Sequence, residues 1–112
     1  MGGHRKRVVR EYYRCIDEDD YERLRSILTA DFVHDRPDMT LEDRNAFVSF
    51  MREERPDPDT EHVVEAVYDG DGRAAAEGRL LRSDDSVWFR FVDTFEFDGD
   101  EVASVRTYVH GS

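Results

Sequence analysis

Cysteine and long apolar runs are scarce in this sequence. Cys15 is the single cysteine among 112 residues, so no internal disulfide forms, and a lone thiol predicts neither a metal site nor a redox motif. No apolar run is long enough to span a bilayer, and no apolar leader follows the basic start at residues 5–7. We therefore expect a soluble, cytoplasmic protein without membrane attachment.

Positive charge is scarce as well. The chain has 16 Lys and Arg residues against 27 Asp and Glu residues, a net charge of -11, and Lys6 is its single lysine. A chain this acidic is not expected to bind nucleic acid. Asp-rich, lysine-poor surfaces resemble those of proteins from salt-loving cells, in which counterions screen the self-repulsion. We therefore expect the stability of the fold to rise with salt concentration.

Length and histidine spacing set further bounds. A chain of 112 residues supports one core, so we expect a single domain over residues 1–112 with a disordered tail at residues 1–4. His62 and His110 lie near the ends of expected strands, and nothing places other ligands at metal-binding spacing from them. We expect neither a metal nor another cofactor.

The first half of the chain has the periodicity of helices. Apolar residues at i, i+3, i+4 and i+7 predict an amphipathic helix over about residues 5–16. A second, short helix is expected to begin after Asp19 as its N-cap. Thr40 followed by Asp43 resembles another capping arrangement, and this third helix should end at about Glu54 because a proline follows two residues later.

The second half of the chain has the pattern of strands. Turn segments rich in Asp, Gly and Ser separate four β-rich runs: Glu61–Tyr68, Arg73–Arg82, Ser86–Phe97 and Glu101–His110. A fifth, short strand at Phe32–Asp35 is expected to pair at an edge. Short loops between consecutive strands predict an antiparallel meander. Three N-terminal helices packed on one face of such a sheet make an α+β domain, with the other face free for a partner.

The third of these strands places a carboxylate in an apolar row. Because successive side chains of a strand point to opposite faces, Asp93 shares a face with Val87, Phe89, Phe91, Phe95 and Phe97. A buried carboxylate must be hydrogen-bonded, paired, or neutral with a raised pKa. Asp93 is therefore either a site residue in a pocket or a structural acid that is satisfied locally or turned to solvent by a bulge.

Three segments of the chain have an informative order and spacing. They are Tyr12–Asp20 (YYRCIDEDD), Ala30–Pro37 (ADFVHDRP) and Phe91–Gly99 (FVDTFEFDG). Together they resemble the nuclear transport factor 2-like superfamily, in its SnoaL-like and ketosteroid isomerase-like branch. The resemblance extends over nearly the whole chain. It implies a cone-shaped fold in which three helices pack on a curved antiparallel sheet around an internal pocket.

The resemblance to the ketosteroid isomerases implies roles for three residues. By motif position, Tyr12 resembles the tyrosine and Asp93 the aspartic acid that hydrogen-bond to an oxyanion. Asp35 resembles the aspartate that moves the proton. The structural alternatives are that Tyr12 is a core residue with its hydroxyl at a rim and that Asp35 caps a turn.

The segment around Asp35 departs from the isomerase pattern. Arg36 stands between Asp35 and Pro37, whereas the isomerase aspartate meets proline directly, so the register requires a one-residue gap. Since many SnoaL-like relatives carry His or Asp about here, His34 is a competing candidate. Neighbouring residues of a strand face opposite sides, so one of the two faces inward. We expect it to be Asp35, provided that Val33 points into the core.

We expect an apolar pocket between the helices and the sheet, with Tyr12, Asp35 and Asp93 as its few polar groups. Such a pocket suits a small, mainly apolar ligand with a carbonyl or enol oxygen. The corresponding chemistry is proton transfer next to a carbonyl, in a cofactor-independent isomerase, cyclase or dehydratase. The expected lining residues are Phe47, Met51, Phe89, Phe91, Phe95, Val105, Thr107 and Val109.

The alternative class is a non-catalytic ligand-binding or dimerisation domain of the same fold. A pocket packed shut by the Phe side chains would favour it. The opposite face of the sheet mixes apolar, aromatic and Arg side chains as protein interfaces do, and the resemblance implies pairing through this face. We therefore expect a homodimer through Trp88, Arg90, Val92, Arg106 and Tyr108.

Overall fold

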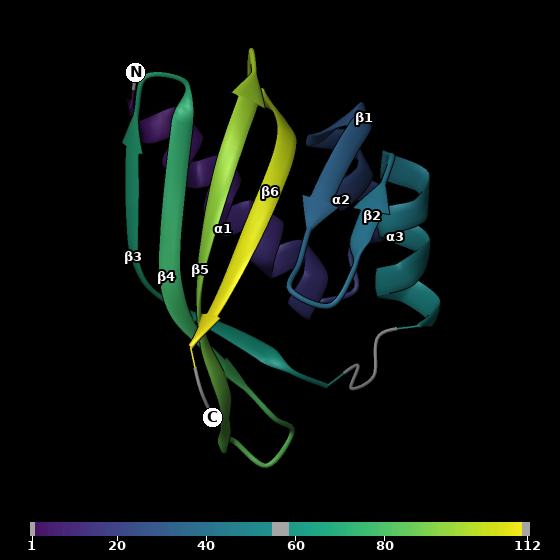
Figure 1. The fold of residues 1–112 in the computed structure, drawn as a ribbon, viewed down its shortest axis with the longest axis vertical. Helices are drawn as coiled ribbons and strands as arrows, with labels where there is room; N and C mark the ends of the chain where they lie inside the picture. Colours follow the sequence, from purple (N-terminus) through teal and green to yellow (C-terminus); the bar gives the residue numbers. More distant parts are fainter. Residues whose placement is uncertain (1, 55–58, 111–112) are drawn as a thin grey trace.

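The described part of the chain, residues 2–54 and 59–110 of a computed structural model, forms three helices and six strands (Figure 1). The helices are α1 (Gly2–Asp17), α2 (Tyr21–Ser26) and α3 (Arg44–Glu53). The strands are β1 (Leu28–Asp35), β2 (Thr40–Glu42), β3 (Glu61–Gly70), β4 (Arg73–Leu81), β5 (Val87–Asp98) and β6 (Glu101–His110). The predicted α+β class is confirmed.

The strands form one curved, open sheet in the order β2-β1-β6-β5-β4-β3. Strands β3 to β6 make the predicted antiparallel meander, whereas β1 runs parallel to β6. Each pair within the meander contains a register shift, and such irregularities bend and twist the strands. Figure 1 shows α1 behind β3 to β6, with α2 and α3 beside β1 and β2.

Helix α1 forms because its apolar residues recur at helical spacing and pack toward the sheet. Val9, Tyr12, Tyr13 and Ile16 are all buried, as the periodicity predicts. The helix begins at Gly2, where we expected a disordered tail over residues 1–4; Met1 lies outside the described residues. A long opening helix thus brings its C-terminal half against the sheet.

The caps of the other helices agree only in part with expectation. Asp20, not Asp19, caps α2, because the Asp20 side chain accepts a hydrogen bond of 3.3 Å from the backbone N–H three residues on. Asp19 instead has a φ of 60° in the turn before it. The Asp43 side chain caps α3 by accepting a hydrogen bond of 2.8 Å from the backbone N–H of Ala46, while Thr40 belongs to β2.

The edge of the sheet beyond β6 differs from prediction. The strand expected at Phe32–Asp35 is longer, and its placement at an edge is wrong, since β1 lies between β2 and β6. Strand β2 was not predicted. Its three residues are too few to establish an alternating pattern, and the Thr-x-x-Asp spacing was interpreted as a helix start.

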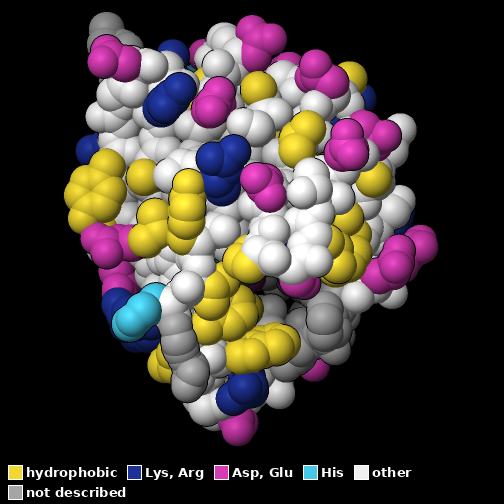
Figure 2. Space-filling model, in the orientation of Figure 1, with side chains coloured by type: hydrophobic (Ala, Val, Ile, Leu, Met, Phe, Trp, Pro, Cys, Tyr) yellow, Lys and Arg dark blue, Asp and Glu magenta, His cyan; other side chains and the backbone are white. Residues whose placement is uncertain are grey.

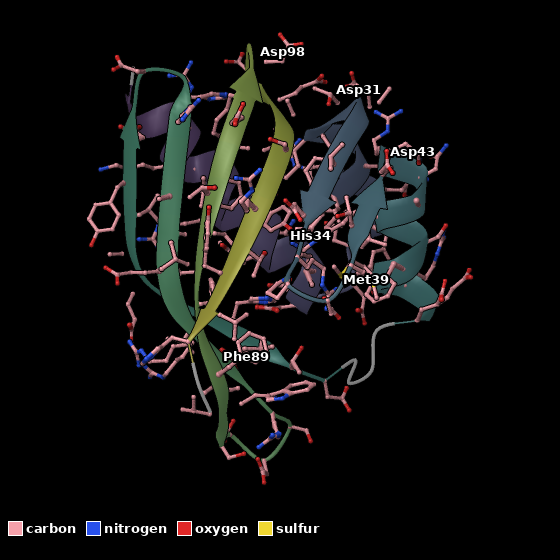
Figure 3. All side chains as sticks on the ribbon, in the orientation of Figure 1. Asp31, His34, Met39, Asp43, Phe89 and Asp98 are labelled. Atoms are coloured by element: carbon pink, nitrogen blue, oxygen red, sulfur yellow. The ribbon has the colours of Figure 1, made fainter. Side chains whose placement is uncertain are left out.

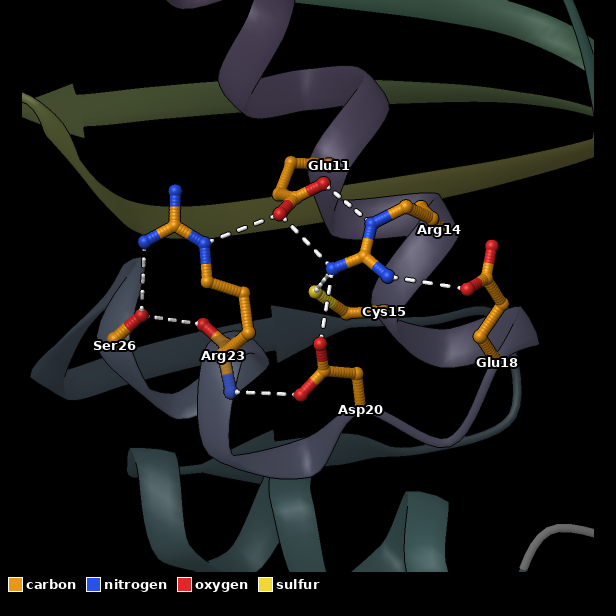
Figure 4. A network of polar contacts seen from close by, with 7 residues as sticks. All are labelled: Glu11, Arg14, Cys15, Glu18, Asp20, Arg23 and Ser26. Atoms are coloured by element: carbon orange, nitrogen blue, oxygen red, sulfur yellow. Dashed lines mark hydrogen bonds and ion pairs between the residues drawn. The ribbon is translucent and has the colours of Figure 1, made fainter.

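A charged network joins α2 to α1 (Figure 4). Arg14 donates hydrogen bonds to Glu11 (2.6 and 3.0 Å), Glu18 (3.2 Å) and Asp20 (3.0 Å), and Arg23 donates to Glu11 at 3.1 Å. The pKa of Glu11 is lowered to about 2, chiefly by the hydrogen bond from Arg14. Because these side chains are partly exposed, we interpret the network as fixing geometry rather than supplying much stability.

On the side of the meander away from α1, the sheet faces the surface of the molecule (Figure 2). Hydrophobic side chains gather there among Arg, Asp and Glu side chains. Tyr68, Val92 and Tyr108 are 56%, 38% and 51% exposed. We call this the outer face. Within residues 2–54 and 59–110, no helix has the length and apolar character needed to cross a membrane.

Candidate functional site

A cavity of about 370 Å³ lies between α1 and the inner face of the sheet. Figure 3 labels two of its residues, His34 on β1 and Phe89 on β5, both well away from Asp98 at the other end of β5. Its apolar lining residues are Ile16, Pro37, Met51, Leu80, Trp88, Phe89, Phe91 and Val109. Its polar ones are Tyr12, Tyr13, His34, Arg36, Asp38, Thr60, His62, Asp93 and Thr107.

Asp93 occupies the inner wall of this cavity and is 5% exposed. The Tyr13 hydroxyl donates a hydrogen bond of 2.6 Å to its Oδ2, and the Thr107 hydroxyl donates one of 2.5 Å to its Oδ1. Burial raises the pKa of Asp93, while these two hydrogen bonds partly oppose the shift. The predicted inward orientation of Asp93 is confirmed, and the protonated form is favoured relative to an exposed aspartate.

His34, rather than Asp35, faces the cavity. His34 is 6% exposed, and its Nε2 lies 2.8 Å from the Thr107 hydroxyl. Because that hydroxyl donates its one hydrogen to Asp93, it accepts from Nε2–H, which leaves His34 Nδ1 as an acceptor. Nδ1 is buried without a hydrogen-bond partner in the described structure. Burial lowers the pKa of His34 to about 3, so the ring is neutral at pH 7.

The expectation that Asp35 points into the pocket is wrong. Phe32 and His34 are buried, whereas Val33 and Asp35 line a separate, more open groove of about 560 Å³ on the outer face. There the Asp35 Oδ2 lies 3.2 Å from Arg106 Nε. The condition attached to the prediction, an inward Val33, is not met. Asp35 therefore cannot reach a molecule bound in the cavity.

Two adjacent tyrosines of α1, Tyr12 and Tyr13, lie at the cavity, whereas we predicted only Tyr12 as a site residue. The ring of Tyr12 packs edge-on against those of Tyr13 and Phe95, at 5.2 and 5.3 Å between centroids. Its hydroxyl has no hydrogen-bond partner among the described residues, and the residue lines the cavity. Tyr13, which we did not predict as a site residue, makes the bond to Asp93. Burial raises the pKa of both tyrosines, so both hydroxyls stay protonated.

The predicted lining residues fall into two groups. Five of them line the cavity: Met51, Phe89, Phe91, Thr107 and Val109. The placement of the other three in the lining is wrong, because Phe47, Phe95 and Val105 are buried in the core behind the wall. Phe47 still shapes the site, since its ring stacks on Tyr12 and meets His34 edge-on. The Phe side chains thus form a wall and do not fill the cavity.

Trp88 lines the cavity, although its neighbour Phe89 does so as well. We had placed Trp88 on the outer face by simple alternation, and this is wrong. Leu80 pairs with Phe89 but Leu81 pairs with Val87, so the strand contains one extra residue at this point. Such a bulge turns two neighbouring side chains toward one side. It also leaves Val87, expected to face inward, 49% exposed.

His62, which lines the cavity, forms a pair with Asp17 that we did not predict from the sequence. Asp17, at the end of α1, accepts a hydrogen bond of 2.9 Å from the backbone N–H of His62, and its other oxygen lies 2.7 Å from His62 Nδ1. The His62 ring packs against Tyr13 and Phe91, at 5.0 and 5.7 Å between centroids. Separated by 45 positions in sequence, the two residues offered no local motif.

Charged residues also lie at the end of β1. Arg36 donates hydrogen bonds of 3.1 and 3.4 Å to the two oxygens of Asp38, and its guanidinium lies 5.1 Å from the centre of the Phe50 ring. Its charge contributes to lowering the pKa of His34. No group of three metal-binding side chains occurs in the part of the chain that the structure describes. Cys15 is buried, which raises its pKa to about 11, so it is not an activated nucleophile.

The arrangement provides hydrogen-bond donors and acceptors in an apolar enclosure. Tyr12 and a protonated Asp93 are donors for a ligand oxygen, and His34 Nδ1 is an acceptor. In a water-poor cavity such groups act more strongly than in solution. The residues therefore suit recognition of a polar oxygen on an otherwise apolar molecule.

Comparison with known proteins agrees with the observed fold. A family model described as the SnoaL-like domain matches residues 9–105. No curated protein matches the chain significantly.

Solved structures share the fold at low sequence identity. A protein of unknown function with a cystatin-like fold from Methylobium petroleophilum has a TM-score of 0.86 and 18% identity, covering 98% of this chain and 78% of that one. A candidate ketosteroid isomerase from Kribbella flavida has a TM-score of 0.82 and 18% identity, and the match covers 98% of this chain and 80% of that one. A candidate isomerase of the SnoaL-like family from Agrobacterium tumefaciens has a TM-score of 0.81 and 17% identity, and the match covers 97% of this chain and 99% of that one. At such identities the likeness shows the fold and not the activity.

Proposed function

Because this chain belongs to the SnoaL-like domain family, we propose that its cavity binds a small, mainly apolar molecule through a carbonyl or enol oxygen. We further propose that it catalyses proton transfer next to that oxygen, as an isomerase, cyclase or dehydratase does. The fold itself suggests small-molecule binding or an isomerase-type function. The observation that carries the proposal is the buried Asp93 in the cavity wall, with a hydrogen-bond donor on each of its oxygens.

The size and lining of the cavity support this class of ligand. About 370 Å³ lies within the usual range for small-molecule sites. Aromatic and aliphatic side chains form most of the wall, while polar groups converge near Asp93. An apolar body with one or two oxygens matches this distribution. A highly charged ligand does not, because the buried polar groups offer it no full counter-charge and the guanidinium of Arg36 is already bonded to Asp38.

The oxygen-binding part of the site is formed by Asp93 and Tyr12. Burial favours the protonated carboxyl of Asp93, and both of its oxygens already accept hydrogen bonds from the protein. Its proton is therefore available to a ligand oxygen. The Tyr12 hydroxyl supplies a second donor. Two donors aimed at one oxygen stabilise the negative charge that develops there when a neighbouring C–H bond loses its proton.

His34 contributes an acceptor in the same wall. Its Nε2 is committed to Thr107, so its free Nδ1 suits a hydroxyl of the ligand. The low pKa of His34 makes the ring a weak base, and we assign it to binding rather than to proton abstraction. A hydroxyl-bearing ligand would then contact both ends of the Asp93–Thr107–His34 chain.

Isothermal titration calorimetry with 2-naphthol tests the proposal, since this phenol has the shape and charge distribution of a small enol. We expect 2-naphthol to bind more tightly than naphthalene, which lacks the oxygen. Tyr12→Phe and Asp93→Leu, each of which removes one donor, should each weaken the binding of 2-naphthol about tenfold, the value of one neutral hydrogen bond. Neither should weaken the binding of naphthalene. Equal affinity for the two compounds in the wild-type protein would contradict the proposal.

We also propose that the outer face pairs with a second copy of the chain. Val92 and Tyr108 are exposed there beside Arg90 and Arg106, a mixture of aromatic, apolar and Arg side chains that is typical of interfaces. Arg90 and Arg106 are partly neutralised within the chain by Glu65 and Asp35. Trp88 is not part of this surface, because it lines the cavity.

A further inference from the structure

The pair formed by Asp17 and His62 is arranged more specifically than an ordinary surface ion pair. One carboxylate oxygen accepts the backbone N–H of His62 and the other faces its ring Nδ1, so Asp17 fixes both the strand start and the orientation of the ring. The side chains of both residues are only 17% exposed.

The partner of Nδ1 determines which ring nitrogen is free. A carboxylate accepts hydrogen bonds and does not donate them, so Nδ1 carries the hydrogen of the neutral ring. The other nitrogen, Nε2, is then a bare acceptor. It has no partner among the described residues, and His62 lines the cavity. In hydrolases with an Asp–His pair, the same arrangement, with Nδ1–H bonded to the carboxylate and Nε2 free to accept a proton, makes the histidine a general base.

The position of His62 relates it to the oxygen-binding groups through one tyrosine ring. The Tyr13 ring packs against His62, while the Tyr13 hydroxyl donates to Asp93. Phe91, two residues before Asp93 on β5, contacts His62 from the sheet side. A charge on His62 is close enough to lower the pKa of Asp93. A small ligand whose oxygen reaches Asp93 therefore presents nearby carbons to His62.

We propose that His62 is the catalytic base of the cavity and that Asp17 is its positioning residue. This inference rests on the proposed function, because it supplies the proton acceptor that the outward-facing Asp35 cannot be. It assigns the chemistry to two residues that we did not predict as site residues.

The proton transfer balances without any further reactant. The lone pair of His62 Nε2 takes a proton from a carbon next to the ligand carbonyl, so a C–H bond breaks and an N–H bond forms. The electron pair of the C–H bond moves to the carbonyl oxygen, where Asp93 and Tyr12 stabilise the enolate. Asp17 stabilises the imidazolium that results. Return of the proton from Nε2 to a carbon regenerates the neutral ring and completes an isomerisation or an exchange with solvent.

The test uses 2-tetralone, an apolar ketone with acidic C–H bonds, and follows C–H to C–D exchange in D₂O by ¹H NMR. Occupancy of the cavity is measured separately through the fluorescence of Trp88, the single tryptophan, which lines the cavity. We expect His62→Gln to slow exchange about 100-fold or more without changing the binding of 2-tetralone. Asp17→Asn should slow it less. His4→Gln, an exposed histidine near the start of α1, is the matched control and should exchange at the wild-type rate.

The outcomes separate this inference from the proposed function. Binding of 2-tetralone with wild-type exchange in His62→Gln would overturn the role of His62 and leave the binding function standing. If the wild-type protein binds 2-tetralone but catalyses no C–H to C–D exchange, the role of His62 is likewise overturned and the binding function stands. Absence of binding to the wild-type protein would remove both.

A measurement on the wild-type protein covers the case in which the variants fail to fold. The ¹⁵N chemical shifts of the His62 ring should show a hydrogen on Nδ1 and a bare Nε2. The opposite tautomer, with its hydrogen on Nε2, would overturn the assignment, because that nitrogen could not accept a proton.

Discussion

Tyr13 donates a hydrogen bond of 2.6 Å to Asp93, and this bond joins the opening helix to the central part of the sheet. The two residues are 80 positions apart in sequence. One contact therefore both anchors α1 and partly opposes the rise that burial causes in the pKa of Asp93.

Removing the Tyr13 hydroxyl should destabilise the protein and raise the pKa of Asp93 further. In Tyr13→Phe, a buried carboxyl oxygen of Asp93 loses its donor, which costs about 1–3 kcal/mol of unfolding free energy. The hydrogen bond from Tyr13 lowers the pKa of Asp93, so its loss favours the protonated acid. Urea denaturation measures the first effect and the pH dependence of the Asp93 carboxyl ¹³C shift measures the second. Tyr12→Phe is the matched control, since its hydroxyl makes no hydrogen bond within the described structure. Equal destabilisation by both variants would contradict the assignment.

His34 should make the folded state sensitive to acid. Its pKa is lowered to about 3 in the folded protein, whereas an unfolded histidine titrates near 6.5. A lowered folded pKa means that the contribution to stability is full above about pH 6.5 and is lost as the pH falls toward 3. Between these two pH values, the unfolding free energy should fall by up to about 1.4 kcal/mol per pH unit because of His34.

The His34→Gln variant isolates this contribution. Asp93 acts in the opposite sense, since its raised pKa gives stability that is present at low pH and lost as the pH rises through the folded value. It remains in both proteins, so the difference between wild type and His34→Gln reports His34. Urea midpoints between pH 4 and 7 should fall less steeply in the variant. Parallel pH dependences would contradict a buried, neutral His34.

Salt should stabilise the fold because the chain carries a net charge of -11. Repulsion among surface carboxylates opposes compaction, and added ions screen it. We expect the midpoint of urea denaturation to rise from low salt to molar KCl. An unchanged midpoint would show that the acidic surface is energetically neutral. KCl is preferred to a sulfate salt, since sulfate stabilises proteins by exclusion whatever their charge.

The outer face should hold two copies together. Multi-angle light scattering at micromolar concentration and high salt should give twice the chain mass of 13.1 kDa. Tyr108→Asp places a charge in the centre of the exposed aromatic and apolar side chains and should give monomers. Met39→Asp is the matched control, because Met39 is also an exposed apolar residue (38% exposed) but lies in the β1–β2 loop. This variant should remain dimeric. A monomeric wild-type protein would contradict the proposal.

Periodicity in the sequence predicted the parts of the fold that depend on local pattern. The helical spacing around Tyr12 located α1, and the alternation around Asp93 placed that residue in the cavity wall. Turn segments fixed the four strands of the meander to within two residues at each end. These predictions succeeded because each depended on one face of one element being buried.

The errors arose where neighbouring residues compete for one face or where distant residues meet. The orientation of His34 and Asp35 depends on how β1 pairs with β6, which includes an irregularity between Leu28 and Val33. The bulge at Trp88 is likewise a property of strand pairing. The Asp17–His62 pair was missed because nothing in either segment alone indicates the other. Tertiary pairing, not local propensity, sets all of these features.

A crystal structure of the protein with 2-naphthol bound tests the proposed oxygen-binding site most directly. We expect the naphthol oxygen to lie within hydrogen-bond distance of both the Asp93 carboxyl and the Tyr12 hydroxyl, with its rings packed on Phe91 and against His62. A naphthol seated in the outer groove, or one in the cavity with its oxygen turned away from Asp93, would contradict it.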